Sequence, residues 1–181
     1  LAYNNLADIA IERGDSAAAE KYYQAAIDSR PSNGYAYHNL AAMRISAQRI
    51  DEAMALYRSA IRADPTLIES YANLSMLLVQ QGKTDEAVEV LQQAVDAKPN
   101  DPRPHVQLAT LSAQQRRFEQ ALVHMNQAVS LAPYSGPLAA ERAHLLLRSG
   151  DWSGAIDAAT QVIDRWPDLP RPYLTRGEAR I

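Results

Sequence analysis

The sequence repeats itself every 34 residues, and this period constrains the fold more than any other feature. The period is marked by five prolines, Pro31, Pro65, Pro99, Pro133 and Pro167. A column of alanines has the same spacing, at Ala19, Ala53, Ala87, Ala121 and Ala155. A second column of small apolar residues reads Ala26, Ala60, Ala94, Ala128 and Val162. Such a period predicts a row of similar units, each packed on its neighbours.

Each unit is predicted to be a hairpin of two helices, as the segment 69–99 shows. Its first apolar run is Tyr71, Leu74 and Leu78, and its second is Ala87, Leu91, Ala94 and Val95. Both runs have the spacing of a single stripe on an α-helix. Gly82 interrupts the first helix, Thr84 can cap the second, and Pro99 ends the unit. In the first unit the same pattern predicts helices near Ala2–Arg13 and Ala17–Ser29.

The units follow one another without a recognisable linker, so we expect one continuous array. Its repeats are expected at residues 1–33, 34–67, 68–101, 102–135 and 136–169, with a partial repeat at 170–181. The glycine of the turn is replaced by Gln48 in the second repeat and by Arg116 in the fourth. Leu1 lies inside the first expected helix and Ile181 inside the last. We therefore expect the array to be a piece of a longer chain.

The repeat resembles the tetratricopeptide repeat. That family has the pattern W-x2-L-G-x2-Y, followed by A-x3-F, an alanine and a proline. The third repeat meets it with Tyr71, Leu74, Ser75, Leu78, Ala87, Leu91, Ala94 and Pro99. The resemblance implies an all-α, right-handed solenoid of antiparallel helix hairpins, in which the first helices line a concave groove. It also implies a protein-interaction module, but the matching residues are packing residues and do not identify a partner.

The composition excludes several classes of function. A net charge of -3 and a pI near 5.8 argue against nucleic-acid binding, which usually needs a basic face. No apolar run approaches the roughly 18 residues of a membrane span, so we expect no membrane insertion. The chain has no cysteine, which is compatible with the cytoplasm or with a bacterial periplasm. Of the two, the cytoplasm is slightly favoured.

Catalysis finds little support in the sequence. The four histidines are His38, His105, His124 and His144, and none belongs to a metal-binding helix motif such as H-E-x-x-H. His105 lies in the aromatic packing column with Tyr37 and Tyr71, so we expect it in or near the core. No phosphate-binding glycine loop and no nucleophile elbow is present. We therefore expect no enzymatic activity within these residues, no metal and no cofactor.

One polar column has a possible binding role. Asn5, Asn39 and Asn73 recur directly before the packing leucine of the first helix, and Gln107, Glu141 and Thr175 continue the column. The arrangement resembles the asparagine ladder in the superhelix of O-linked N-acetylglucosamine transferases. An amide carries a donor and an acceptor, as does a peptide backbone, so a row of amides can hold an extended chain. The alternative is that these amides bond to neighbouring helices.

The resemblance places further residues in the groove. With Asn5, Asn39, Asn73 and Gln107, the candidate peptide-binding residues are Asp8, His38, Met76, Arg103, Thr110 and His144. The carboxylate clamp of co-chaperones is not matched, because only Asn39 fits its register.

Three functions remain open from the sequence. The first is a non-catalytic scaffold that binds an extended peptide or partner segment in the groove. The second is the substrate-recruiting arm of a larger enzyme, such as a glycosyltransferase, whose active site lies outside these residues. The third is a scaffold that associates with copies of itself.

Overall fold

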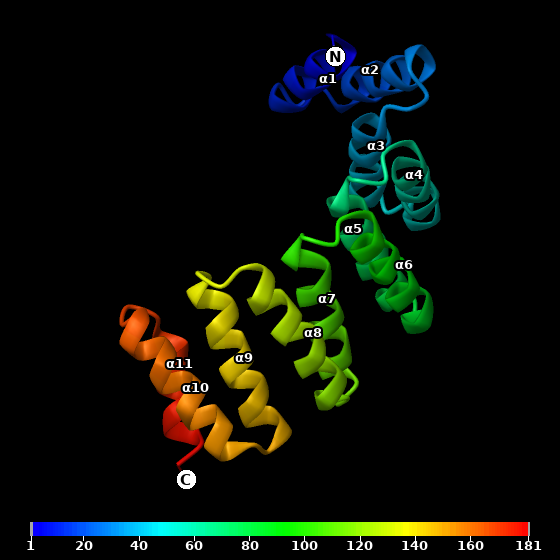
Figure 1. The fold of residues 1–181 in the computed structure, drawn as a ribbon. Coiled ribbons are helices and arrows are strands. Elements are labelled where there is room, and N and C mark those ends of the chain that lie inside the picture. The colour runs from blue at the N-terminus through cyan, green and yellow to red at the C-terminus, as the bar shows by residue number, and fades with distance from the viewer. Residues whose placement is uncertain (1, 181) are drawn as a thin grey trace. The chain divides into compact units, whose positions relative to one another are not determined.

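The computed structural model describes residues 2–180, and throughout this range every regular element is an α-helix (Figure 1). The chain divides into two compact units, Leu1–Lys98 and Pro99–Ile181. The first unit contains α1 (Ala2–Glu12), α2 (Ser16–Ser29), α3 (Gly34–Ser46), α4 (Ile50–Ala63), α5 (Ile68–Gln80) and α6 (Thr84–Ala97). The second contains α7 (Pro102–Gln114), α8 (Phe118–Leu131), α9 (Gly136–Ser149), α10 (Trp152–Arg165) and α11 (Pro170–Glu178). Leu1 and Ile181, for which the sequence predicts helix, lie outside the described residues.

Consecutive helices pack in pairs within each unit. The hairpins of the first unit are α1–α2, α3–α4 and α5–α6, and α2–α3 and α4–α5 contacts join them. In the second unit α7 packs on α8 and α9 on α10, while α8–α9, α10–α11 and α9–α11 contacts complete it. The predicted fold class, an all-α solenoid of antiparallel helix hairpins, is confirmed.

The helices begin and end close to where the sequence predicts. The first helix ends at Glu12, one residue before the expected Arg13, and the second begins at Ser16 rather than Ala17. The second difference has a local cause, because the Asp15 carboxylate accepts a hydrogen bond from the Ala18 N–H. Asp15 therefore caps a helix that starts with the next residue.

The alanine column forms the inside of the hairpins. Each of its five members has an exposed fraction of 0%, namely Ala19, Ala53, Ala87, Ala121 and Ala155. The second small column is also buried, with Ala60, Ala94 and Ala128 at 0%. Small side chains let the two helix backbones approach closely, and the dense packing leaves no space for a larger residue. The small residues that recur every 34 positions therefore lie where the helices cross.

The turn inside a hairpin needs a left-handed backbone. Gly14, Gly82 and Gly150 have φ angles of 76°, 75° and 89°. Gln48 and Arg116 replace this glycine and keep the conformation, with φ angles of 60° and 59°. A side chain in this region costs about 1–2 kcal/mol, so these two repeats retain the turn geometry at an energetic disadvantage.

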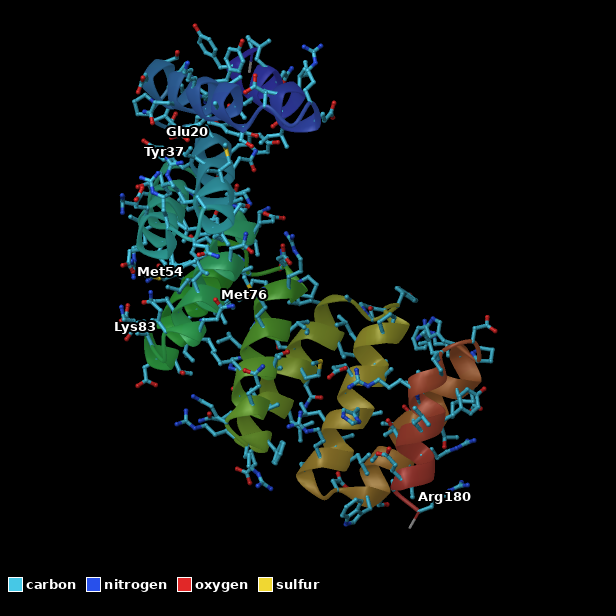
Figure 2. All side chains as sticks on the ribbon, turned by 180° about the vertical axis from the view of Figure 1, so that it is seen from behind. Glu20, Tyr37, Met54, Met76, Lys83 and Arg180 are labelled. Atoms are coloured by element: carbon cyan, nitrogen blue, oxygen red, sulfur yellow. The ribbon has the colours of Figure 1, made fainter. Side chains whose placement is uncertain are left out.

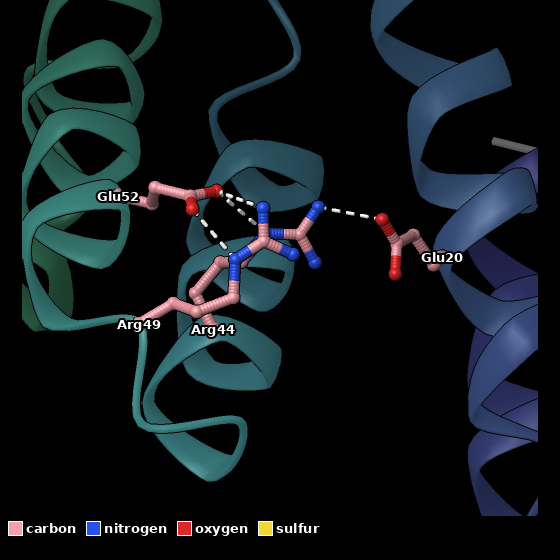
Figure 3. A network of polar contacts seen from close by, with 4 residues as sticks. All are labelled: Glu20, Arg44, Arg49 and Glu52. Carbon is pink, nitrogen blue, oxygen red and sulfur yellow. Dashed lines mark hydrogen bonds and ion pairs between the residues drawn. The ribbon is translucent and has the colours of Figure 1, made fainter.

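A polar network joins α2, α3 and α4 within the first unit (Figure 3). Arg44 lies between Glu20 and Glu52, with nitrogen–oxygen distances of 2.6 and 3.3 Å, and Arg49 contacts Glu52 at 2.6 Å. The hydrogen bond from Arg44 holds the pKa of Glu20 below its usual value. This network links the first two hairpins, and the negative charges of its glutamates are balanced by arginines of the chain itself.

Candidate functional site

The first unit contains a pocket of about 460 Å³ between α1, α2 and α3. It is lined by Asp8, Ile11, Glu12, Tyr23, Tyr35, Asn39, Ala42, Met43 and Ser46. We call this set the Asp8 pocket. Asp8 and Glu12 are four residues apart on α1, so both lie on the face that borders the pocket. Two of the predicted groove residues, Asp8 and Asn39, meet here.

Polar side chains of the Asp8 pocket form a chain of hydrogen bonds. The Asn39 amide donates from Nδ2 to the Tyr23 hydroxyl over 3.1 Å, and that hydroxyl donates to Asp8 Oδ1 over 2.6 Å. The Tyr35 hydroxyl donates to the other carboxylate oxygen, Oδ2, over 3.1 Å. Burial, reinforced by the bond to Asp8, raises the pKa of Tyr23 well above its usual value. The phenol is therefore neutral, and the carboxylate is held from two sides.

The next interval of the first unit repeats the amide–tyrosine contact. Asn73 Nδ2 donates to the Tyr57 hydroxyl over 3.1 Å, and the two residues are 16 apart, as are Tyr23 and Asn39. Beside this pair, His38 Nδ1 lies 2.9 Å from Ser70 Oγ, and the imidazole meets the Tyr57 ring edge-on. Burial lowers the pKa of His38. We call Tyr57, Asn73, His38 and Ser70 the Tyr57 site.

The asparagine column therefore has a structural contact as well as a candidate binding role. Asn39 and Asn73 are half-buried, and each is bonded to the second helix of the preceding hairpin. This is the bonding to neighbouring helices that the sequence left open as the alternative. Each contact uses one amide N–H, and the carbonyl oxygen has no partner among residues 2–180. Asn5 is exposed, and its side chain makes no hydrogen bond in the described part of the chain.

Met76 is the remaining candidate of the first unit. It lies on α5, where Figure 2 labels it. Its exposed fraction is 48%. An exposed methionine can adapt its shape to different apolar side chains.

The second unit carries the other four candidates. On α7, Gln107 has a buried side-chain oxygen without a hydrogen-bond partner within residues 2–180, and Thr110 donates to the Val106 carbonyl. Arg103 is ion-paired with Asp101 at 2.6 Å. On α9, burial and the nearby Arg171 lower the pKa of His144. These residues share no polar contact with one another among the described interactions, so no joint site emerges.

Two histidines of the second unit lie together. His105 Nδ1 is 3.4 Å from His124 Nδ1, and burial lowers the pKa of both. His105 is half-buried, as its place in the aromatic column predicts. Across residues 2–180, no group of three or more histidine, aspartate or glutamate side chains is arranged to hold a metal. Within the same range, no helix has both the length and the apolar character needed to cross a membrane.

Tyrosine hydroxyls are the site feature that the sequence pattern did not reveal. Tyr23 and Tyr57 occupy the large apolar position of the repeat, so the pattern by itself indicates a packing role. A signal was present, because a buried tyrosine usually needs a hydrogen-bond partner. The first two repeats carry tyrosine there, and an asparagine follows 16 residues later in both.

Comparisons with known proteins agree on the class of fold. Two models of the tetratricopeptide-repeat family match residues 4–68 and 44–111, which together span more than half of the chain. Among curated proteins, none matches the sequence. Solved structures of similar fold also exist, and those compared below have low sequence identity to this chain.

Three solved structures illustrate the likeness. YrrB, described as a tetratricopeptide-repeat protein with an unusual peptide-binding site, is 19% identical with a TM-score of 0.71, covering 97% of this chain and 90% of its own. A tetratricopeptide repeat protein from Parabacteroides merdae is 18% identical with a TM-score of 0.75, covering 98% and 70%. PilF of Pseudomonas aeruginosa is 21% identical with a TM-score of 0.71, covering 99% and 86%.

Fold and pattern together define a repeat scaffold built from helix hairpins. The chain belongs to the tetratricopeptide-repeat family. Proteins of this family are generally non-catalytic scaffolds for protein or peptide partners.

Proposed function

We propose that this chain is a non-catalytic scaffold that holds an extended peptide segment along the first helices of its repeats. The observation that carries the proposal is the pair Asn39 and Asn73, which occupy the same position in successive repeats. Each amide is fixed by one bond to a tyrosine and keeps its carbonyl oxygen unpaired within the described residues. An amide fixed in this way is pre-organised to accept a bond from a peptide N–H, which lowers the entropic cost of binding.

The spacing of the two amides favours an extended ligand. Asn39 lies on α3 and Asn73 on α5, so the same type of contact recurs along the first unit from one hairpin to the next. Backbone groups are common to all peptides, so these contacts provide affinity for a polypeptide chain rather than for a particular sequence. The exposed Met76 adds a contact that depends on the ligand's side chains. YrrB offers an analogy, since that protein is described as having a peptide-binding site.

Asn73→Ala tests the proposal, and Tyr57→Phe is its matched control. Both variants remove the bond between the amide and the phenol, but only Asn73→Ala also removes the amide that would meet a ligand. We expect both to lower stability by about 0.5–1.5 kcal/mol. Affinity for peptides selected from a random library on the intact chain should fall roughly 2- to 13-fold further in Asn73→Ala. Equal affinities of the two variants would show that the amide is structural only.

A further inference from the structure

The Asp8 pocket has a chemistry that the asparagine column does not explain. Its lining contains two carboxylates, Asp8 and Glu12, and no lysine, arginine or histidine. Neither carboxylate takes part in an ion pair within residues 2–180. Like charges at i and i+4 on a helix repel each other modestly, so this arrangement favours a cation that is not part of the fold.

On the other side of the same hairpins, carboxylates have a different environment. There, Glu20 and Glu52 flank Arg44, and Arg49 pairs with Glu52 (Figure 3). Carboxylates on that surface are compensated by arginines of the chain itself. In the Asp8 pocket no basic side chain of the lining balances the negative charge of the carboxylates, so only solvent or a ligand can do so.

The hydrogen bonds around Asp8 orient its carboxylate without neutralising it. Tyr23 and Tyr35 each occupy one site on one oxygen. An ionised carboxylate offers about four acceptor sites, so each oxygen can still accept another donor. A guanidinium presents parallel N–H groups that match the two oxygens of a carboxylate, and an ammonium can meet one of them.

The rest of the lining suits the stem of a long basic side chain. Ile11, Ala42 and Met43 provide apolar contact, and Tyr35 is 44% exposed. Lysine and arginine bury their aliphatic stems against such surfaces while the charged end reaches a polar group. Arginine also stacks on aromatic rings. A pocket of about 460 Å³ lies within the range of about 300–1,000 Å³ typical of ligand sites.

We infer that the Asp8 pocket binds a lysine or arginine side chain of a peptide held in the groove, so that the scaffold prefers basic peptide segments. This inference rests on the proposed function, because the pocket lies between α1 and α3 and shares Asn39 with the asparagine column. The pocket adds a preference for a basic side chain to the backbone contacts of the asparagines, which do not depend on the peptide sequence.

Selection from a random peptide library on the intact chain, followed by substitution in one selected peptide, tests the inference. We expect a lysine or arginine at a fixed position of the selected sequences. Replacing that residue by glutamine should weaken binding roughly 10- to 100-fold, the range expected for a charge-assisted contact. Asp8→Asn, which keeps an acceptor for the tyrosines, should weaken binding of the basic peptide similarly and leave the glutamine peptide unchanged. The preference should also decrease as ionic strength rises.

Two further variants separate charge in the pocket from general effects. Asp157→Asn removes one negative charge from the exposed face of α10 and should leave the basic preference intact. Asp85→Asn removes one negative charge from an exposed position of α6 in the first unit, away from the pocket, and should also retain the preference. Selected peptides without a basic residue, or a preference that survives in Asp8→Asn, would overturn this inference and leave the proposed function standing. A chain that selects no peptide would overturn both.

Discussion

The Asp8 pocket and the Tyr57 site share a tyrosine–asparagine pair at equivalent positions of successive repeats, yet only the set of residues called the Asp8 pocket contains carboxylates. Both contain a tyrosine bonded to an asparagine 16 residues later, with the same 3.1 Å distance. Shifting by one repeat replaces Asp8 by Ala42 and Glu12 by Ser46. Tyr57 therefore has no counterpart of Asp8 to which it could donate.

The two sites show which contacts are the same in these successive repeats and which side chains differ. The amide–tyrosine contact connects one hairpin to the next and occurs in the first two intervals, as Tyr23–Asn39 and Tyr57–Asn73. Asp8 and Glu12 and their counterparts in the next repeat lie outside the buried core, so packing does not fix the residue type at these positions. A repeat scaffold of this kind can keep a common backbone-binding element and change its side-chain specificity at each step.

The largest expected difference between the two sites concerns the tyrosine hydroxyls. Tyr23→Phe removes bonds to Asp8 and Asn39, whereas Tyr57→Phe removes only the bond from Asn73. Because one partner of Tyr23 is charged, we expect a loss of about 1.5–3 kcal/mol for Tyr23→Phe and about 0.5–1.5 kcal/mol for Tyr57→Phe. Urea unfolding measures both.

Tyr22→Phe is the control for these variants, since the Tyr22 hydroxyl makes no hydrogen bond within residues 2–180. It should change the free energy of unfolding by less than about 0.5 kcal/mol. Equal losses for Tyr23→Phe and Tyr57→Phe would mean that the hydrogen bond from Tyr23 to Asp8 adds nothing to stability.

The next prediction tests whether the two hairpins that carry Tyr23 and Tyr57 pack in the same way. Ala19 and Ala53 are both fully buried at the crossing of their hairpins. Ala19→Leu and Ala53→Leu should each overpack the crossing at a cost of about 1–3 kcal/mol. A neutral result for one of them, measured by thermal unfolding, would show that the two hairpins do not pack alike.

A smaller effect is expected at the turns. Gln48 has a φ of 60° where the first repeat has Gly14 at 76°. Gln48→Gly should stabilise the chain by up to about 1 kcal/mol, because the relief of left-handed strain exceeds the added entropy of the unfolded glycine. A loss of stability would show that the Gln48 side chain contributes more than its backbone costs.

The smallest effect distinguishes the sites by pH. His38 belongs to the Tyr57 site, and burial lowers its pKa, whereas Asn4 occupies the equivalent position of the first repeat. The unfolded chain therefore binds more protons than the folded one as pH falls through the ordinary histidine pKa of about 6.5, and stability decreases there. His38→Gln should reduce this decrease between pH 7.5 and 5.5 in chemical unfolding. An unaltered pH dependence would mean that His38 titrates normally in the folded chain.

The sequence predicted the fold because the packing residues recur without a gap. Ala53 and Ala87 are fully buried as their column requires, and even Gln48 keeps the turn that glycine forms elsewhere. The candidate site was predicted less completely. Periodicity places Asn39 on one side of its helix, but it cannot show that Tyr23, from another helix, directs a hydroxyl toward it. Contacts between repeats depend on the helix crossing, which the pattern of one helix does not encode.

Glu12 and Met43 illustrate the same limit. Each borders the Asp8 pocket, but neither belongs to a column that repeats with a functional residue type. Their roles come from the approach of α1 to α3, which brings together side chains that are about 30 residues apart.

The central claim, that a fixed asparagine amide accepts a bond from a peptide backbone, can be tested with a double-mutant cycle. A selected peptide is compared with versions N-methylated at each backbone position in turn, on the intact chain and on Asn73→Ala. If the amide accepts a backbone N–H, methylation at one position should cost about 0.5–1.5 kcal/mol more on the intact chain than on the variant. If every methylated peptide loses the same affinity on both proteins, Asn73 does not contact the peptide backbone, and the account of the groove is contradicted.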